Sequence, residues 1–321
     1  MDEKENNVDI SVVIVNWNVS GLLRQCLDSL YRFTRDLSFE VFVIDNNSSD
    51  GSAEMVAREF PRVILISNSR NLGFSAGNNQ ALRRAKGRYS LLLNPDTQLV
   101  DNSLKAMVDF MDGHPEVNSV APRLIFSDGS LQESCRHFPS LFTDLSESLY
   151  LDEAFPGNRI FNWYRIGVCS YDRPGPVDQP YGACLLFRKE DLARLDFMDE
   201  GFFMYYDEID LCYRLKRSGG VIYYLPQIRV IHHGNQSSRQ IPDACHFWKL
   251  RSRLAFFNKH YGAPAMAGLF LNLILRSFIV YGLFSASYLL IGRPRDLKYF
   301  KGTVKCMWKE YLDFVKGSKK R

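Results

Sequence analysis

Short apolar runs alternate with helical segments over the first hundred residues, and this alternation restricts the fold more than any other feature of the chain. Four runs rich in β-branched residues or leucine predict buried strands at 10–15, 41–44, 63–66 and 89–93. The apolar spacing between them predicts helices at 20–31, 52–60 and 75–86. Strands that alternate with helices form right-handed crossovers, so we expect a parallel sheet with helices on both faces.

Polar residues stand where three of these strands end. Asn16 and Asn18 follow the first strand, Asp45 ends the second, and Asn94-Pro95-Asp96 ends the fourth. The carboxyl ends of parallel strands meet at the edge of the sheet where α/β proteins bind ligands. At that edge Asp45 can accept hydrogen bonds from a base or ribose, and Asp96 suits a divalent cation that holds a diphosphate. An Asx turn is the structural alternative for each aspartate.

Residues 71–79 open the third predicted helix with a sequence rich in amides and glycine. Asn71, Gly73 and Asn78 lie where free N–H groups favour a phosphate or sugar, although Gly73 and Gly77 also suit a simple backbone turn. The sequence has no Gly-x-Gly-x-x-Gly after the first strand and no Gly-x-x-x-x-Gly-Lys-Ser/Thr. These absences argue against a dinucleotide-dependent dehydrogenase and against a P-loop enzyme.

The second half of the chain carries a second group of candidate residues around a predicted helix at 208–217. Predicted strands flank this helix at 117–121, 124–126, 181–187, 221–225 and 228–232. Small residues at Gly182 and Ala183 would let a ligand approach the backbone. Asp207 and Asp210 resemble a capping pair, whereas Glu208 has no evident partner and lies beside aromatic residues that favour a working base. His232 follows a strand, where it suits a metal ligand or a hydrogen-bonded loop residue.

In this order the motifs resemble the family 2 glycosyltransferases of GT-A fold, in their rhamnosyltransferase-like branch. The matching stretches lie within 9–262: 12–18, 43–52, 71–79, 93–96, Gly182-Ala183, 202–212 without Tyr206, and His232. The resemblance implies an α/β fold with a Rossmann-like nucleotide-binding half at 9–98 and a mixed-sheet acceptor half at 99–262. A C-terminal helical tail would follow at 263–321.

The resemblance also implies an activity and a role for each motif. The reaction would be an inverting, metal-dependent transfer of a sugar, rhamnose among the candidates, from a nucleoside diphosphate donor to a lipid-linked or polysaccharide acceptor in cell-surface glycan biosynthesis. Glu208 would be the base, with Asp207 as the second candidate, and Mg²⁺ or Mn²⁺ would bind Asp96 and His232. The acceptor would contact Gly182, Ala183 and Tyr206. The donor would contact Val15, Asn16, Asn18, Asp45, Asn71, Gly73, Asn78, Asn94 and Asp96.

Two departures from the family pattern keep other functions open. Many relatives have Asp-x-Asp at the metal, where this chain has Asn94, and the usual Glu-Asp order is reversed at Asp207-Glu208. A pseudoenzyme that binds sugar nucleotides without transferring them is therefore one alternative. A nucleotidyltransferase is the other, but it would need a glycine-rich loop and a lysine, which 16–20 does not contain.

Residues 263–321 are first apolar and then basic. The apolar stretches 263–275 and 277–291 are separated by Arg276, and an arginine at the centre of a bilayer costs about 2.5 kcal/mol or more. The remaining thirty residues contain ten Lys or Arg and an apolar stripe at helical spacing. This pattern predicts a helix that lies on the anionic inner face of the cell membrane. A helical pair packed on the catalytic domain or on the second subunit of a homodimer is the alternative.

Composition restricts the remaining possibilities. The net charge of +4 is too small to indicate a nucleic-acid partner. Seven cysteines are scattered without a Cys-x-x-Cys pair, which is typical of reduced thiols in a cytosolic protein. The N-terminus is polar and has no signal-peptide pattern, so we expect a cytoplasmic catalytic domain.

Overall fold

The computed structural model describes residues 8–291 apart from 166 and 235. Two compact units divide the chain: unit 1 comes from 1–138 and 165–242, and unit 2 from 139–164 and 243–321. The basic helix expected beyond 291 lies outside the described residues. The predicted functional halves 9–98 and 99–262 and the predicted boundary at 262 stay predictions.

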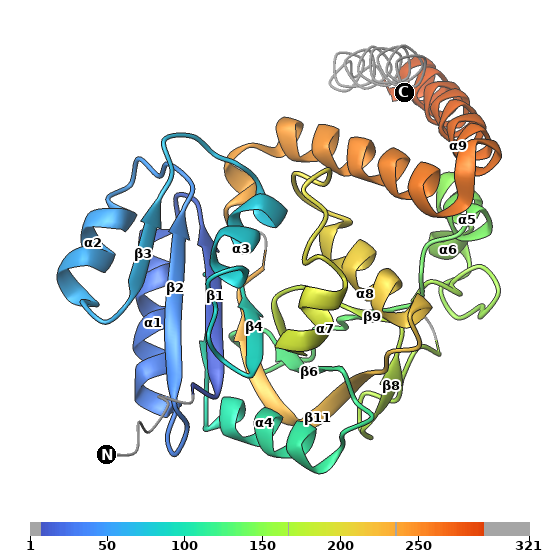
Figure 1. Cartoon of the computed structure of the whole chain (residues 1–321). Coiled ribbons are helices and arrows are strands. Elements are labelled where there is room, and N and C mark those ends of the chain that lie inside the picture. Colours follow the sequence, from blue (N-terminus) through green and yellow to red (C-terminus); the bar gives the residue numbers. More distant parts are fainter. Residues whose placement is uncertain (1–7, 166, 235, 292–321) are drawn as a thin grey trace, which may run out of the picture. The chain divides into compact units, whose positions relative to one another are not determined.

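Four parallel strands begin the central sheet of unit 1 (Figure 1). In spatial order they are β3 (Ile64–Ser67), β2 (Phe39–Asp45), β1 (Ile10–Asn16) and β4 (Tyr89–Leu93). Alternate residues of β1 enter different cores because successive side chains of a strand point to opposite faces. Val12 and Ile14 pack in one core, and Val13 and Val15 in the other. The predicted parallel layer is confirmed.

The sheet becomes mixed at β10 (Cys184–Arg188), which pairs antiparallel with β4. The strands beyond it are β6 (Ser119–Ile125), β11 (Ile222–His232), β5 (Thr97–Leu99) and, paired with β11, β8 (Gly175–Val177). A separate ribbon pairs β7 (Cys135–Arg136) with β9 (Gln179–Pro180). The predicted α/β fold with a mixed second part is therefore confirmed.

The prediction of separate strands at 117–121 and 124–126, and at 221–225 and 228–232, was wrong. The stretches at 117–126 and 221–232 form the single strands β6 and β11, each of which contains a proline. Pro122 of β6 pairs with Leu225, beside the register shift between Leu225 and Arg229 in β11. Because the ladder is interrupted at this bulge, a proline without an N–H is tolerated there.

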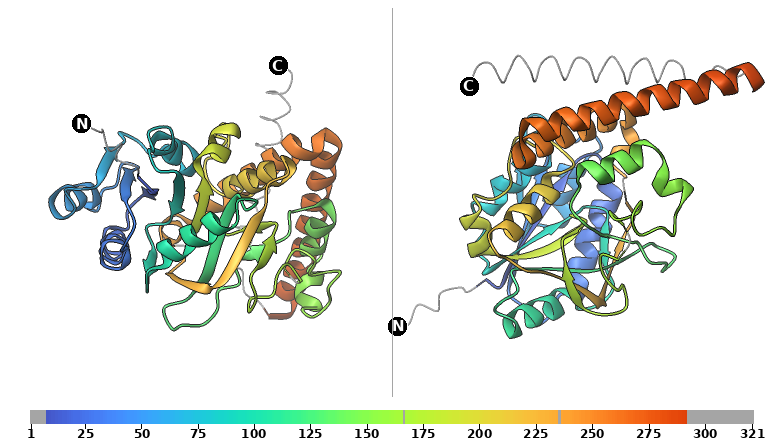
Figure 2. Two further views of the ribbon diagram at one scale, coloured as in Figure 1. Left: turned by 60° about the horizontal axis from the view of Figure 1, so that its bottom comes forward. Right: turned by 90° about the vertical axis from the view of Figure 1, so that its right-hand side faces the viewer.

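Helices cover both faces of the sheet (Figure 2). One core includes residues of α1 (Ser20–Phe33), α2 (Ser52–Glu59) and α4 (Ser103–Gly113). The other core includes residues of α3 (Phe74–Leu82), α7 (Lys189–Arg194) and α8 (Asp207–Arg217). Helix α3 ends four residues earlier than predicted, because the chain must return to β1, where Gly87 donates its N–H to the Ser11 hydroxyl at 2.8 Å.

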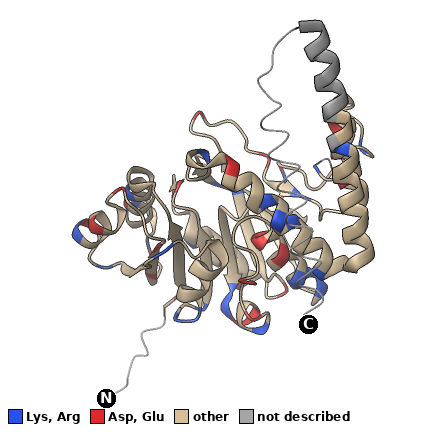
Figure 3. Cartoon of the chain, turned by 90° about the horizontal axis from the view of Figure 1, so that it is seen from above, with Lys and Arg blue, Asp and Glu red and all other residues tan. Residues whose placement is uncertain are grey.

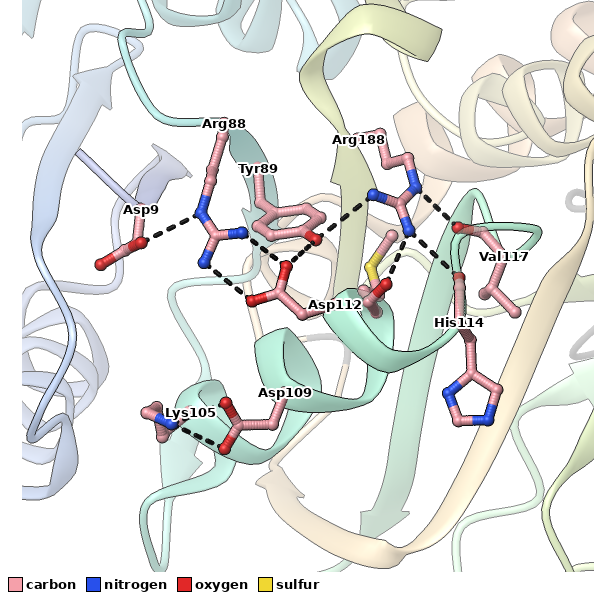
Figure 4. Close-up of polar contacts among 10 residues, drawn as sticks. Asp9, Arg88, Tyr89, Lys105, Asp109, Asp112, His114, Val117 and Arg188 are labelled. Atoms are coloured by element: carbon pink, nitrogen blue, oxygen red, sulfur yellow. Dashed lines mark hydrogen bonds and ion pairs between the residues drawn. The ribbon is translucent and has the colours of Figure 1, made fainter. Parts of the chain in front are cut away.

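A polar cluster secures the amino end of β4 (Figure 4). Arg88 donates to Asp9 at 3.0 Å and to Asp112 at 2.8 Å, and the Tyr89 hydroxyl donates to Asp112 at 2.6 Å. The Arg88 hydrogen bond lowers the pKa of the Asp112 carboxyl. Arg188 donates to the carbonyl oxygens of Val117, Met111 and His114. These contacts are structural and lie at the opposite edge of the sheet from the candidate ligand edge.

Unit 2 pairs the first part of α9 (Pro242–Ile291) with the short helices α5 (Leu141–Ser148) and α6 (Leu151–Ala154). The Tyr261 hydroxyl donates to the Pro139 carbonyl at 2.8 Å, and Asn272 donates to Asp144 at 3.1 Å. Gly262 has φ +80° and interrupts the helical geometry of α9. Across the described residues, no helix combines the length and the apolar character needed to cross a bilayer.

Candidate active site

Asp45 lies buried at the carboxyl end of β2, next to the end of β1. Its Oδ1 accepts a hydrogen bond from Asn16 Nδ2 at 3.0 Å, and its Oδ2 accepts one from the Ser48 backbone N–H at 2.9 Å. The Asx turn, which the sequence left open as a structural role for Asp45, is therefore present. The two bonds also fix the carboxylate at the ligand edge with lone pairs left to accept a hydroxyl or base N–H.

Asn18 joins two loops at the same edge. Its Oδ1 accepts a hydrogen bond from the Ser49 N–H at 2.7 Å, and its carbonyl oxygen accepts one from Gln240 at 2.7 Å. Gln240 belongs to a short 3-10 turn, Ser238–Gln240, and the neighbouring Ser237 hydroxyl donates to the Trp17 carbonyl at 3.0 Å. The segment after β11 therefore packs against the loop after β1, a contact that the sequence pattern did not indicate.

Asp96 and His232 meet between β4 and the end of β11. Asp96 Oδ1 lies 3.4 Å from His232 Nε2, and both residues are buried. His232 Nδ1 lies 2.7 Å from Gln132 Oε1. With Gln132 as acceptor, Nδ1 carries a hydrogen, and Nε2 faces Asp96, where it can bind a cation or donate to the carboxylate.

The donor atoms of this pair fit a divalent cation. Two electron-rich atoms that face each other repel unless a proton or cation lies between them. Asp96 would supply a carboxylate oxygen and His232 an imidazole nitrogen, and both are ligand types that divalent ions such as Mn²⁺ bind. Among the described residues, no group of three or more His, Cys, Asp and Glu could hold a metal ion alone. A divalent ion held by Asp96 and His232 would therefore need further ligands from outside the described protein residues.

His233 follows His232 directly and suited the same two roles by sequence, but only His232 was predicted as a metal ligand. Its backbone N–H donates to the Asp96 carbonyl oxygen at 2.9 Å. Its Nε2 is buried and has no hydrogen-bond partner among the described residues. The His-His pair was the available signal, since the first histidine faces Asp96 through its side chain and the second holds the Asp96 backbone.

Gly73 lies at the N-terminus of α3 against the loop that precedes α8. Its φ of +88° and ψ of −179° belong to a region of backbone space that is essentially restricted to glycine. A Cβ at this position would lie 2.4 Å from the Phe203 carbonyl oxygen. The same oxygen accepts a hydrogen bond from the Phe74 N–H at 2.7 Å, so one of the helix's free donors is already used.

Other residues of this predicted donor region are held by internal contacts. Asn71 Oδ1 accepts a hydrogen bond from the Gly73 N–H at 2.9 Å, and Asn78 Nδ2 donates to the Phe74 carbonyl at 2.9 Å. A Cβ at Gly77 would lie 3.1 Å from the Val15 side chain, so α3 packs closely on β1. Val15 therefore contacts α3 at Gly77, whereas Asn71 and Asn78 make local hydrogen bonds with Gly73 and Phe74.

Helix α8 begins with an unusual turn. Tyr205 and Tyr206 have φ of +64° and +60°, a conformation that is strained for bulky residues and is often found at functional sites. The predicted capping by Asp207 and Asp210 was wrong, since Tyr206 is the N-cap residue and makes no side-chain cap. The predicted pair of Asp210 with Arg214 is confirmed at 2.7 Å.

Asp207 and Glu208 occupy different environments in the first turn of α8. Asp207 is buried, and its Oδ2 has no hydrogen-bond partner among the described residues. Burial, and next the charge of Glu208, raise the pKa of Asp207 well above its ordinary value. Glu208 is only half-buried. Glu208 is therefore the one of the two carboxylates that solvent reaches.

Gly182 and Ala183 connect Glu208 with the end of β4. A Cβ on Gly182 would lie 3.1 Å from Glu208 Cβ, so the glutamate lies over the glycine. The Ala183 carbonyl accepts a hydrogen bond from the Asn94 N–H at 2.9 Å. Asp96 is two residues further along the chain. The predicted acceptor residues thus lie between the predicted base and the predicted metal ligand.

The fold and this edge define a class of protein. A sheet that changes from parallel to antiparallel beside β4, with carboxylates at the carboxyl ends of its strands, is the arrangement of a GT-A glycosyltransferase. The profile of Glycosyl transferase family 2 matches residues 11–169, about half of the chain. The chain belongs to this family, and it is a nucleotide-sugar-dependent glycosyltransferase. The predicted family and enzyme class are confirmed.

The relatives of known name include rhamnosyltransferases. An N-acetylglucosaminyl-diphospho-decaprenol L-rhamnosyltransferase of Mycobacterium tuberculosis is 28% identical over 312 residues, which cover 91% of this chain and 98% of the relative. Rhamnosyltransferase WbbL of Escherichia coli K12 is 26% identical over 255 residues, which cover 77% of this chain and 92% of the relative. Both similarities extend beyond the segment that the family profile matches.

A solved structure supports the fold. The mannosyltransferase PcManGT of Pyrobaculum calidifontis, in complex with GDP-Man and Mn²⁺, aligns with a TM-score of 0.55 over 97% of this chain and 87% of its own. The sequence identity is 16%, so this similarity concerns the fold alone.

Proposed function

We propose that the protein transfers a sugar, with rhamnose as the first candidate, from a nucleoside diphosphate donor to a glycan linked to a lipid diphosphate. The M. tuberculosis relative is named for an acceptor of this kind. The observation that carries the proposal is the Asp96–His232 pair, in which Gln132 contacts the second nitrogen of the His232 ring. The pair is linked to Glu208 by neighbouring contacts: Asn94 donates to the Ala183 carbonyl, and Gly182 lies against Glu208.

The donor diphosphate would bind at the Asp96–His232 pair together with Mg²⁺ or Mn²⁺. A divalent ion bound there would act as a Lewis acid that neutralises the charge of the departing nucleoside diphosphate. Asn94 contributes a neutral amide where many relatives have a carboxylate, so Asp96 supplies the negative charge of this site. Asp45 would accept hydrogen bonds from the nucleoside at the end of β2, where Asn16 holds it.

Glu208 would act as the general base. As it takes the proton of an acceptor hydroxyl, the oxygen attacks the anomeric carbon, a C–O bond forms, and the bond from that carbon to the diphosphate oxygen breaks. A single displacement of this kind inverts the anomeric centre. A positioned base contributes on the order of a hundredfold or more in rate. Asp207, whose raised pKa keeps it protonated to higher pH, would orient the turn rather than accept the proton.

Unit 2 would bind the surface of an anionic membrane. Eleven large apolar side chains are exposed among the described residues, and nine of them belong to unit 2: Leu141, Phe142, Phe155, Ile160, Trp163, Tyr261, Leu271, Leu275 and Phe278. Leu271, Leu275 and Phe278 recur at helical spacing on α9, and Arg276 is the one charged residue between 263 and 278 by sequence. Figure 3 shows how the acidic and basic residues are distributed over the chain. By sequence, unit 2 contains sixteen Lys and Arg against eight Asp and Glu. Apolar aromatic side chains with an excess of positive charge favour an anionic lipid interface.

Replacement of Glu208 tests the assignment of the base. Glu208→Gln should lower the rate of transfer about a hundredfold or more while nucleoside diphosphate affinity stays within twofold. Glu54→Gln, at an exposed position of α2, is the matched control and should leave both quantities unchanged. A fully active Glu208→Gln enzyme would remove the assignment. A wild-type protein that binds donors with Mn²⁺ but neither transfers nor hydrolyses them would identify the pseudoenzyme that Asn94 suggested.

A further inference from the structure

Arg136 of β7 is buried and has no carboxylate partner in the part of the chain that the structure describes. Its residue surface is 9% exposed. Its Nη1 donates to the Cys135 carbonyl at 2.6 Å and its Nη2 to the Tyr181 hydroxyl at 3.1 Å, while the guanidinium lies 5.3 Å from the centre of the Tyr181 ring. Among the described residues it has no ion pair and no other hydrogen bond. A guanidinium has five N–H donors, so most of them have no protein acceptor.

Two other arginines with little exposed surface have several acceptors in the protein. Arg214 pairs with Asp210 and also donates to the carbonyl oxygens of Leu195 and Phe197. Arg188 donates to three carbonyl oxygens and to the Tyr89 hydroxyl (Figure 4). A buried charge is costly unless it is paired. Among the described residues, Arg136 differs from Arg214 because it has no carboxylate partner, and from Arg188 because it has two protein acceptors rather than four.

The position of Arg136 relates it to the candidate active site. It is held against Tyr181, and the next residue, Gly182, lies against Glu208. Four residues before Arg136 along the chain, Gln132 orients His232 at the metal pair. The segment 132–136 therefore runs from the donor side of the site to the acceptor side, and Arg136 stands at the acceptor end.

The positive charge acts on its neighbours. The hydrogen bond from Cys135 is the largest cause that lowers the pKa of Cys169, and the charge of Arg136 adds to it against the opposing effect of burial. A local positive potential of this kind attracts an anion. Arginine is also the side chain best suited to bind phosphate, because its planar fork donates two parallel hydrogen bonds.

We propose that Arg136 binds the diphosphate group of a lipid-linked acceptor and so positions the acceptor sugar beside Glu208. The assignment rests on the proposed function, since it names the acceptor-side ligand of the same site. The donor diphosphate has its own position at Asp96 and His232, which leaves Arg136 for the acceptor. When bound, the two charged diphosphates would lie on opposite sides of the reacting sugar.

Geranyl diphosphate is a suitable probe because it is a short, water-soluble isoprenyl diphosphate. Its binding to the full chain would be measured by calorimetry without metal, and nucleoside diphosphate binding would be measured separately with Mn²⁺. Arg136→Gln should weaken geranyl diphosphate binding about tenfold to a hundredfold, the usual effect of losing a charge-assisted contact, and leave nucleotide affinity within twofold. Arg136→Lys should lie between the wild type and Arg136→Gln, because it keeps the charge without the fork.

Two further variants separate binding from structure. Arg88→Gln removes the same charge at the opposite edge of the sheet and should leave geranyl diphosphate affinity unchanged. Tyr181→Phe removes a protein partner of Arg136 but not its charge, and should keep binding within about threefold even if the melting temperature falls. Equal geranyl diphosphate affinity in Arg136→Gln and the wild type, or an absence of binding to the wild type, would overturn the proposal.

The remaining outcomes identify which proposal has failed. A loss of nucleotide affinity in Arg136→Gln with unchanged geranyl diphosphate binding would assign the arginine to the donor and overturn the acceptor role. If Arg136→Gln does not fold, unchanged geranyl diphosphate binding in Arg136→Lys, with the melting temperature lowered, would likewise overturn it. Binding that depends on Arg136 in a protein without transfer activity would support the anion site and contradict the proposed function alone.

Discussion

The variant Gly73→Ala tests whether the loop around Gly73 positions Glu208, the proposed base. An alanine Cβ would lie 2.4 Å from the Phe203 carbonyl oxygen and 2.7 Å from the Phe203 ring. Since real Cβ atoms do not approach heavy atoms within 3.0 Å, the Phe203 backbone must move by roughly 0.6 Å or more. The backbone geometry of Gly73 costs a non-glycine residue about 1–3 kcal/mol. Loss of the Phe74–Phe203 hydrogen bond adds about 0.5–1.5 kcal/mol.

The expected result is a loss of about 2–4 kcal/mol in the free energy of unfolding, measured by urea denaturation. Phe203 lies five residues before Glu208, on the strained turn that begins α8, so its displacement would move the base. A misplacement of about 1 Å at a reacting group costs about a hundredfold in rate. The initial rate of transfer should therefore fall by about that factor.

Gly51→Ala is the matched control for the strain of a positive φ. Gly51 has φ +78°, and no heavy atom lies within 4 Å of a Cβ built there. The control should lose about 1–2 kcal/mol of stability and keep its transfer rate. The reasoning would be refuted if Gly73→Ala kept more than half of the wild-type rate, or if Gly51→Ala lost as much activity as Gly73→Ala.

Two further predictions concern Asp207 and unit 2. Burial, and next the charge of Glu208, raise the pKa of Asp207. The folded state therefore binds the Asp207 carboxyl proton more tightly than the unfolded state does. The stability gained in this way is fully present below the ordinary aspartate pKa and is lost as pH rises through the raised pKa of the folded state. Asp207→Asn should therefore be more stable than the wild type at pH 8 and show a weaker decline in stability from pH 5 to pH 8 by urea denaturation; a variant that is less stable at pH 8 would contradict this. Leu271→Ser with Phe278→Ser should weaken binding to anionic vesicles tenfold or more in a sedimentation assay, because each side chain buries apolar surface worth about 1.5–3 kcal/mol. Phe126→Ser, at an exposed position of unit 1, should have no effect, and a dimer that forms through the same α9 side chains would contradict the membrane assignment.

The parallel part of the fold could be predicted because it depends on local patterns. Each of the first four strands is a short apolar run that ends in polar residues, and the carboxyl ends of such strands must share an edge. This rule placed Asp45 and Asp96 at one edge without any knowledge of distant contacts. The prediction that Asp96 and His232 share a site had another source, because it came from the family resemblance and not from the strand pattern.

Long-range packing could not be predicted from the same patterns. By sequence, Gly73 suited a backbone turn or a phosphate-binding loop. In the structure a glycine is needed there because Phe203, 130 positions further along the chain, leaves no space for a Cβ. Arg136 lies outside every strand and helix that the sequence predicted, and its lack of a carboxylate partner among the described residues appears only when its spatial neighbours are known. The two segments of unit 2 are likewise about eighty residues apart in sequence, so their association left no local signal.

Metal-dependent nucleotide binding tests the central claim most directly. In calorimetry with a panel of nucleoside diphosphates, Mn²⁺ should increase the affinity of the wild type, and this increase should be lost in Asp96→Asn and His232→Ala. Gln132→Leu, which removes the partner of His232, should lower Mn²⁺ affinity about tenfold or more, whereas His114→Ala at the opposite edge of the sheet should change nothing. An increase in affinity with Mn²⁺ that persists in both Asp96→Asn and His232→Ala would contradict the account.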